Sequence, residues 1–337
     1  MLGARAMPTV LVTGGAGFIG AHLTKALLDR GQDVVVLDDL SGGFSDNVDP
    51  RARLVRGSIV DHELVDSLFA SEHPRRVYHL AAYAAEGLSH FIKRFNYTNN
   101  VIGSVNLINA SVNHDVECFV FTSSIAVYGA GQLPMSEDMR PEPEDSYGIA
   151  KYSVERELAV SREMFGLDYV IFRPHNVYGE LQNIGDRYRN VLGIFINQIM
   201  QGQPLSIFGD GEQTRAFSYV GDIIPAIADA PDVEAARGNV FNVGADVPYS
   251  VNDLADAVRR AMGVPDHPVV HEPPRNEVKH AFSDHSRAQA VFGDDARTPL
   301  EEGLARMVGW ARDHGPRATE AFTDIEIERN LPPVWRA

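Results

Sequence analysis

The sequence predicts an α/β fold built on a doubly wound parallel sheet, followed by a smaller C-terminal α/β lobe. Six short apolar runs alternate with helical patterns along the first half of the chain, and this alternation is typical of parallel strands joined by helices. After about residue 174 the alternation loosens and Pro and Gly punctuate shorter elements. We expect a sheet domain over 8–174, a second lobe over 175–315 with some chain crossing back, and a terminal arm over 316–337.

The first 30 residues of the sheet domain form a βαβ pattern. The apolar run Thr9–Val12 leads into Gly14, Gly17 and Gly20, a helical pattern continues to Gly31, and Asp33–Asp38 reads as a second buried strand. Glycines at this spacing let backbone N–H groups approach a pyrophosphate at a helix N-terminus. The strand before them and the helix after them predict a Rossmann-type dinucleotide site.

An acidic residue ends the second strand. Asp38 is placed to accept hydrogen bonds from ribose hydroxyls, and its charge would repel a 2′-phosphate, which favours NAD over NADP. The alternative is that Asp38 or Asp39 caps the turn at Leu40–Gly43.

The remaining runs continue the rhythm. Further strands are expected at Leu54–Arg56, Val77–Leu80, Cys118–Phe121 and Tyr169–Phe172. Ligands of such sheets lie beyond the carboxyl ends of the strands. We therefore expect one crevice lined by the residues that follow five strands, which are Gly14, Asp38, Ala81, Ser124 and Arg173. In the C-terminal lobe we expect helices at Asn190–Gln201, Val251–Met262 and Leu300–His314, and strands at Leu205–Phe208, Val240–Val243 and Val269–His271.

Composition narrows the class of protein. A net charge of −16 argues against general binding to nucleic acid or to anionic membranes. The single cysteine, Cys118, excludes an internal disulfide and a multi-cysteine metal site, and it fits a reducing cytoplasm. We find no apolar run long enough to span a bilayer, and residues 1–7 lack the apolar core of a signal peptide. A cytoplasmic protein is expected.

Tyr147 and Lys151, four residues apart, are the candidate acid/base pair. Residues four apart share one face of a helix, where the ammonium of Lys151 can stabilise a Tyr147 phenolate and so make it a base near neutral pH. The alternative is a half-buried aromatic ring beside a solvated cation.

Five motifs in this order resemble the extended short-chain dehydrogenase/reductase superfamily, and within it the NAD-dependent nucleotide-sugar epimerases and dehydratases. They are the glycines 14, 17 and 20, Asp38, Thr122–Ser124, the Tyr147/Lys151 pair and Arg173–Gly179. The resemblance covers residues 8 to 315.

The resemblance implies roles for individual residues. Tyr147 becomes the acid/base, Lys151 lowers its pKa and holds the nicotinamide ribose, and Ser124, with Ser123 close by, bonds the reacting sugar oxygen. The implied NAD contacts are Gly14, Gly17, Phe18, Ile19, Gly20, Asp38, Asp39, Ser58, Ile59, Leu80, Ala81, Ala82, Tyr147, Lys151 and His175. Ser58 departs from the Asp usual in the family, and His175 has a core histidine as its alternative.

The same resemblance implies a site for a UDP-sugar. The implied contacts are Ser123, Ser124, Asn176, Asn190, Val191, Leu205, Arg215 and Arg275. In an acidic protein the two arginines suit a diphosphate, whose oxygens accept from planar guanidinium groups. The alternative for each arginine is a surface salt bridge.

The reaction subclass is argued from an absence. Dehydratases of this family carry an acidic pair before the Val-Tyr-Gly that follows the catalytic strand, whereas this chain has Ile125 and Ala126 there. Without a second acid/base, redox at C4 and return of the hydride give 4-epimerisation. Glu86 is the acidic residue that would reopen elimination, and a solvated loop residue is its alternative.

The expected activity is therefore that of an NAD-dependent UDP-sugar 4-epimerase, with UDP-glucose, UDP-GlcNAc and UDP-glucuronate left open as substrates. Alternatives are a dehydratase or decarboxylase of the same family, a non-catalytic NAD-binding protein, and a dehydrogenase that consumes NAD. No metal is expected. Apolar faces on 91–113 and 146–165 predict a homodimer.

Overall fold

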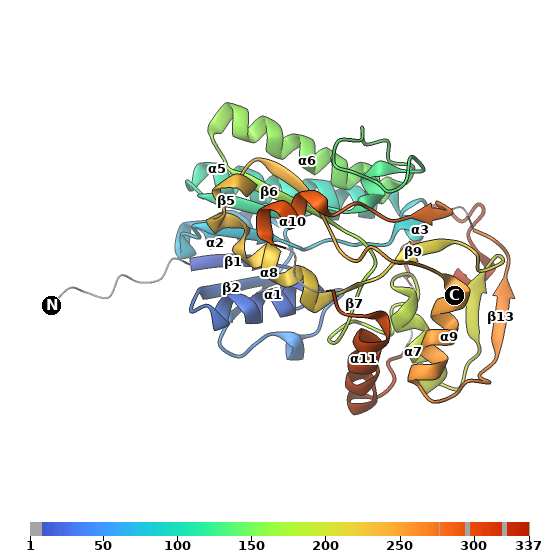
Figure 1. The fold of residues 1–337 in the computed structure, drawn as a ribbon. Coiled ribbons are helices and arrows are strands. Elements are labelled where there is room, and N and C mark those ends of the chain that lie inside the picture. Colours follow the sequence, from blue (N-terminus) through green and yellow to red (C-terminus); the bar gives the residue numbers. More distant parts are fainter. Residues whose placement is uncertain (1–8, 276, 294–296, 319–321, 337) are drawn as a thin grey trace.

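The computed structural model describes residues 9–275, 277–293, 297–318 and 322–336 (Figure 1). The N-terminal residues on which we based the signal-peptide argument lie outside these ranges. No helix in these ranges is long and apolar enough to cross a membrane.

A seven-stranded parallel sheet forms the centre of the molecule. Its strand order is β11-β6-β5-β4-β1-β2-β3, and all neighbouring strands are parallel. Successive strands are added on one side of β1 as far as β3 and on its other side from β4 onward, so the sheet is doubly wound. The strands span β1 Thr9–Thr13, β2 Asp33–Asp38, β3 Arg53–Arg56, β4 Arg76–His79, β5 Cys118–Thr122, β6 Tyr169–Pro174 and β11 Asn239–Val243.

Helices cover both faces of the sheet, as Figure 1 shows. Alternate residues of each strand serve opposite faces, so Val10 and Val12 pack with Leu23 and Leu27 of α1, while Leu11 packs on the other side. The helices over the two faces are α1 Phe18–Asp29 and α8 Val220–Asp229 on one side, and α2 His62–Glu72, α5 Gly103–Asn113 and α6 Ser146–Phe165 on the other.

Local signals explain where these helices begin and end. Asp61 and Asp145 cap α2 and α6 by accepting hydrogen bonds from the amides of Leu64 and Gly148, and α6 ends at Gly166 in the left-handed conformation. Two short helices, α3 Glu86–Ser89 and α4 Lys93–Tyr97, precede a π-helical turn at Thr98–Ile102 that leads into α5.

The C-terminal lobe combines the helices α7, α9, α10 and α11 with small sheets of two or three short strands. Parallel β8 and β13, parallel β7 and β10, and mixed β12-β9-β14 are small sheets separate from the central one. The elements are β7 Val177–Tyr178, α7 Val191–Met200, β8 Leu205–Phe208, β9 Thr214–Ala216, β10 Ser218–Tyr219, β12 Pro248–Ser250, α9 Val251–Ala261, β13 Val269–Glu272, β14 His280–Ala281, α10 Ser286–Phe292 and α11 Leu300–His314.

One strand lies elsewhere than the sequence pattern suggested. We expected 240–243 to be a short strand of the C-terminal lobe, but β11 pairs with β6 as a seventh strand of the central sheet. Asn239–Val243 aligns residue for residue with Val170–Pro174, and α8 packs on α1. Residues 220–243 therefore return to the sheet domain after the chain has entered the second lobe.

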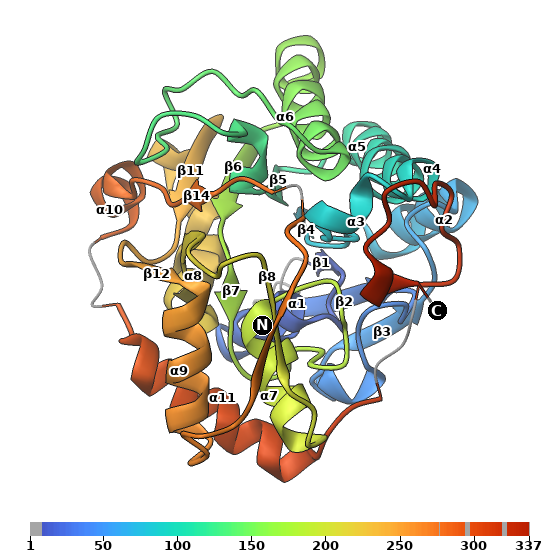
Figure 2. The ribbon, with the colours of Figure 1, turned by 90° about the vertical axis from the view of Figure 1, so that its right-hand side faces the viewer.

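The C-terminal arm closes over the molecule. Its last turn, Pro333–Trp335, buries Trp335 in a cluster with Leu88 and Ile92 from the α3–α4 segment. Glu326 accepts hydrogen bonds from the amides of Arg94 and Phe95, each at 2.9 Å. Figure 2 shows this arm, in dark red, lying against α3 and α4.

Candidate active site

A cavity of about 470 Å³ opens at the carboxyl ends of the central strands and extends between the sheet and the C-terminal lobe. It brings together most residues that the sequence nominated. Those that line it are Gly14, Gly17, Phe18, Ile19, Gly20, Asp38, Asp39, Ile59, Leu80, Ala81, Ala82, Glu86, Ser123, Ser124, Tyr147, Lys151, Asn176, Asn190, Val191, Arg215 and Arg275. Arg173 is the strand-end residue that does not.

The glycine loop is shaped for a closely approaching ligand. Gly14 has φ +73°, and a Cβ there would lie 2.6 Å from the amide nitrogen of Ala81. A Cβ on Gly20 would lie 2.1 Å from the carbonyl oxygen of Gly14, so both positions require glycine. Helix α1 begins after Gly17 without a side-chain cap, which leaves its first amides directed at the cavity. This cradle fits the pyrophosphate of a dinucleotide.

Asp38 has two functions available. Its carboxylate accepts hydrogen bonds from the amides of Ala16, at 2.9 Å, and Leu40, at 2.8 Å, which fixes the loops on either side. The turn interpretation is therefore correct for the Leu40 bond, and Asp39 likewise accepts from the Ser41 amide at 2.9 Å. Asp38 also faces the cavity and is 8% exposed, so ribose hydroxyls can still reach it.

Helix α6 carries Tyr147 into the cavity on its first turn. The Tyr147 amide donates to Ser89 Oγ at 3.2 Å, and Asp145 caps the same turn. Ser124, two residues beyond the end of β5, lies beside the Tyr147 side chain and acts to lower the pKa of Tyr147. Its Oγ also accepts from the Ala126 amide at 3.1 Å. The two hydroxyls therefore face the same point of the cavity.

The pKa of Tyr147 in the protein alone differs from the sequence expectation. Burial raises it, the charge of Glu86 raises it further, and the opposing effects of Ser124 and Arg189 are smaller. The phenolate expected near neutral pH is opposed by this burial, because desolvation of the phenolate outweighs its stabilising neighbours. A positive charge brought into the cavity would lower the pKa of Tyr147.

Lys151 is fully enclosed by protein. It is 3% exposed, its Nζ donates to the carbonyl oxygen of Thr122 at 2.8 Å, and it lies 5.8 Å from the centre of the Tyr147 ring. Burial lowers the pKa of Lys151 to about 7, opposed by the charge of Glu155. The lysine is thus held on the strand end beside Tyr147, where it lines the cavity.

A buried ion pair supports this strand end. Arg173 and Glu155 are each about 4% exposed, joined by two hydrogen bonds, and Arg173 also donates to the Tyr128 hydroxyl at 2.7 Å. Ser123 Oγ donates to Glu155 at 2.5 Å. The Ser123 hydroxyl is therefore engaged by the ion pair, and Arg173 is a structural residue beneath the cavity.

Two arginines enter the cavity from the C-terminal lobe. Arg215 lies 3.7 Å and Arg275 3.1 Å from the carboxylate of Glu277, which holds both without closing them off from the cavity. The guanidinium of Arg275 also lies over the Phe208 ring, 4.6 Å from its centre. The salt-bridge alternative is thus correct for both, and both still face the cavity.

Besides Arg173, three nominated residues do not line the cavity: Leu205, Ser58 and His175. Leu205 is fully buried in the core because β8 alternates, and Ser206 and Phe208 face the cavity in its place. Ser58 accepts from the Val60 amide, and its neighbours Gly57 and Ile59 form that wall.

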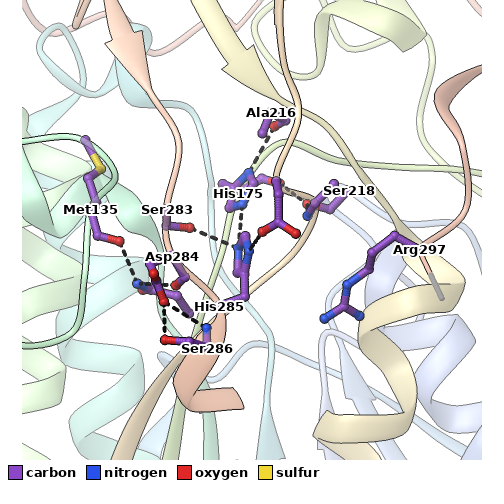
Figure 3. Close-up of polar contacts among 12 residues, drawn as sticks. Met135, His175, Ala216, Ser218, Ser283, Asp284, His285, Ser286 and Arg297 are labelled. Atoms are coloured by element: carbon purple, nitrogen blue, oxygen red, sulfur yellow. Dashed lines mark hydrogen bonds and ion pairs between the residues drawn. The ribbon is translucent and has the colours of Figure 1, made fainter. Parts of the chain in front are cut away.

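His175 belongs to a buried hydrogen-bonded chain instead of the cavity (Figure 3). Its Nε2 lies 3.0 Å from Nε2 of His285, whose Nδ1 lies 2.5 Å from Asp246, and its Nδ1 lies 3.0 Å from the Ala216 carbonyl oxygen. Burial lowers the pKa of His175 to about 4, aided by the charge of His285. The core-histidine alternative is the correct one.

Sequence reasoning missed several residues at the site. Arg189, just before α7, lines the cavity and is held by Asp186 at 2.6 Å. Phe208 also lines the cavity, and Trp335 lies against Arg275 with 5.9 Å between the guanidinium and its ring. Arg189 adjoins Asn190 and Val191, which were nominated, but the arm that carries Trp335 gives no local signal.

Comparison with known proteins agrees with this geometry. The model of the NAD dependent epimerase/dehydratase family matches residues 10–244. The chain belongs to this family. A UDP-glucose 4-epimerase of Mycolicibacterium smegmatis is 36% identical over 310 residues, which cover 90% of this chain and 98% of the relative.

Two solved structures are similar over about nine-tenths of the chain. The UDP-glucose 4-epimerase of Thermotoga maritima, determined with UDP-glucose, has a TM-score of 0.85 and 35% identity, covering 91% of this chain and 99% of that one. The UDP-glucuronic acid 4-epimerase of Bacillus cereus, determined with UDP-glucuronic acid and NAD, has a TM-score of 0.82 and 29% identity, with coverage of 91% and 99%.

These findings confirm four expectations: the family, the Rossmann-type fold, NAD as cofactor, and an enzyme of the isomerase class. They leave the sugar open, because relatives with different UDP-sugars are similar to this chain to comparable degrees.

Proposed function

We propose that the protein is a UDP-sugar 4-epimerase that oxidises C4 of the sugar to a ketone and reduces it again on the opposite face. NAD occupies the glycine-loop side of the cavity, and the C-terminal lobe holds the UDP moiety. The observation that carries the proposal is the pairing of Tyr147 with Ser124 at one point of a cavity that also contains Arg215 and Arg275.

In the proposed mechanism the chain's own residues position and deprotonate the sugar. When bound, NAD⁺ would supply the acceptor for the hydride of C4 and a positive charge near Tyr147. Tyr147 takes the proton of the C4 hydroxyl and returns it after the ketone has turned over. Ser124 donates to the same oxygen as negative charge develops on it. Lys151 holds the strand end beside Tyr147 and adds positive charge, while Arg215 and Arg275 bind the diphosphate.

The local structure near Tyr147 supports return of the hydride to C4 without elimination of water from the sugar. Ile125 and Ala126 begin the 3₁₀ turn after Ser124, and neither belongs to the described residues that line the cavity. Their side chains offer no acid or base to remove a proton from C5.

Product analysis tests the reaction type. Purified holoenzyme incubated with UDP-glucose, UDP-GlcNAc or UDP-glucuronate, without added reductant, is expected to form the C4 epimer of at least one sugar. A keto-deoxy sugar would instead indicate a dehydratase, and a UDP-pentose a decarboxylase. The observation that favours a dehydratase or decarboxylase is Glu86, whose carboxyl group lines the same cavity.

We further propose a homodimer formed through α5 and α6. Four apolar side chains on α6 are strongly exposed: Ile149 (41%), Val160 (45%), Met164 (66%) and Phe165 (65%); Ile102 before α5 is 51% exposed. Light scattering is expected to give about twice the chain mass of 37.0 kDa. A monomer that persists at micromolar concentrations would contradict this part of the proposal.

A further inference from the structure

Glu86 is held firmly at the wall of the cavity. It begins α3, whose last residue Ser89 donates to the Glu86 carbonyl oxygen at 2.6 Å and accepts from the Tyr147 amide at 3.2 Å. On the other side, Gly87 packs against the Trp335 ring so closely that a Cβ there would lie 3.1 Å from it. Helix α3 is thus fixed between the first turn of α6 and the C-terminal arm.

The charges around Glu86 locate it along the cavity. Asp145 acts on it from the Tyr147 side, and Arg215, Arg275 and Glu277 act from the C-terminal lobe. In turn, Glu86 is the foremost charge acting on Tyr147. Given the proposed function, Tyr147 marks the reacting carbon and the arginines mark the diphosphate. The sugar ring spans the distance between them, and Glu86 therefore faces the sugar.

The carboxylate of Glu86 remains available to a ligand. None of the ion pairs within 4.0 Å among the described residues includes it, because Glu277 holds Arg215 and Arg275 and Asp186 holds Arg189. Glu86 is solvent-exposed within the open cavity, so its carboxylate can accept hydrogen bonds from a sugar hydroxyl.

We propose that Glu86 is a specificity-determining residue that favours UDP-sugars with a neutral hexose over UDP-hexuronates. This deepens the proposed function and rests on it for the placement of the sugar. A hydroxyl of a neutral hexose hydrogen-bonds to the carboxyl group. The carboxylate of a hexuronate meets like charge from Glu86 and Asp145. Arg215 and Arg275 are engaged by the diphosphate and by Glu277, so this sugar is disfavoured by repulsion.

The test compares two substrates that differ at C6, UDP-glucose and UDP-glucuronate. For the wild-type holoenzyme we expect kcat/KM to be at least tenfold higher with UDP-glucose. In Glu86→Gln, which keeps the shape and removes the charge, the preference is expected to fall at least tenfold, mainly through a gain with UDP-glucuronate. Glu63→Gln, an exposed position on α2 outside the cavity lining, is the matched control and keeps the wild-type preference.

Three results would overturn the role of Glu86. They are a wild-type preference for UDP-glucuronate, an unchanged preference in Glu86→Gln, and an equal loss with both sugars, which would place Glu86 in a step common to them. Retained NAD in Glu86→Gln verifies that the variant is folded.

Binding separates this inference from the proposed function. Calorimetry of both UDP-sugars with the wild type and Glu86→Gln measures the same discrimination without turnover. If no C4 epimer forms but discrimination in Kd still falls in Glu86→Gln, the epimerase proposal fails and the role of Glu86 stands. If Kd discrimination is unaltered by Glu86→Gln, the role of Glu86 fails even where epimerisation occurs.

Discussion

At the residue scale, the site depends on side chains held in costly surroundings. Lys151 and Tyr147 are both buried, and desolvation opposes the charged form of each. Such groups lower the stability of the folded chain while serving its chemistry.

Replacing Lys151 tests this cost directly. The unfolded chain keeps a proton on Lys151 up to its ordinary pKa of 10.5, whereas the folded chain releases it near 7. The free energy of unfolding contributed by Lys151 therefore falls as the pH decreases from 10.5 to 7, and methionine has no such dependence. The difference in free energy of unfolding between Lys151→Met and wild type should therefore shift in favour of the variant by about 3–4 kcal/mol from pH 10 to pH 7, at about 1.4 kcal/mol per pH unit.

Denaturant unfolding of both proteins at the two pH values measures this difference. Lys93→Met, at an exposed position on α4, is the control and should show no pH-dependent gain. Turnover by Lys151→Met is expected to fall by orders of magnitude. If the difference in free energy of unfolding between Lys151→Met and wild type is the same at both pH values, the lowered pKa of buried Lys151 is contradicted.

At the element scale, loops joined by buried polar groups fix the second lobe to the sheet. The His175–His285–Asp246 chain joins the end of β6 to the residues after β14 and β11, and the Ala216 carbonyl oxygen adds β9 (Figure 3). These elements converge where the chain passes between the lobes.

Acid should weaken this junction. The pKa of His175 is about 4 in the folded chain against an ordinary 6.5, because burial and His285 outweigh the Ala216 carbonyl and Asp246. The stability that depends on neutral His175 is fully present above pH 6.5 and is lost as the pH falls toward 4. His175→Gln is expected to flatten this decline in the free energy of unfolding, measured by denaturant titration between pH 7 and pH 4.

The control for the histidine prediction is His62→Gln, at the exposed start of α2. It should keep the wild-type slope. The prediction fails if His175→Gln loses stability with acid as steeply as the wild type does.

The elements that were predictable from the sequence are those with local signals. Leu300–His314 and Leu205–Phe208 were expected with the bounds that the structure has, because periodicity, glycines and prolines mark their ends. Periodicity could not assign 239–243 to the central sheet, since the partner β6 lies some 70 positions earlier and pairing is non-local. For the same reason Leu205, although on the correct strand, was placed on the wrong face.

At the scale of the whole molecule, the C-terminal arm joins the two walls of the cavity. Trp335 packs near Tyr188 and Phe208 of one lobe and Phe91 of the other, and the Val334 carbonyl oxygen accepts from Arg187 at 2.5 Å. No property of the arm's composition indicates this role, because its contacts are all distant in sequence.

Trp335→Ala tests whether the arm supports substrate binding. Removing the indole takes away the ring that packs against both Arg275 and Phe208, so KM for the converted UDP-sugar is expected to rise at least fivefold while NAD stays bound. Trp310→Ala on α11, outside the cavity lining, is expected to lower stability and leave KM unchanged. If both variants change KM equally, the arm does not support substrate binding specifically and only stabilises the fold.

The central claim is that Tyr147 drives one redox cycle at C4 with nothing eliminated. Its most direct measurement is the product formed from UDP-glucose by the holoenzyme and by Tyr147→Phe, followed by NMR without added cofactor or reductant. The wild type is expected to form UDP-galactose, and turnover by Tyr147→Phe is expected to be at least a thousandfold lower with NAD still bound. Epimerisation by Tyr147→Phe at a near-normal rate, or a keto-deoxy sugar as the wild-type product, would contradict this claim.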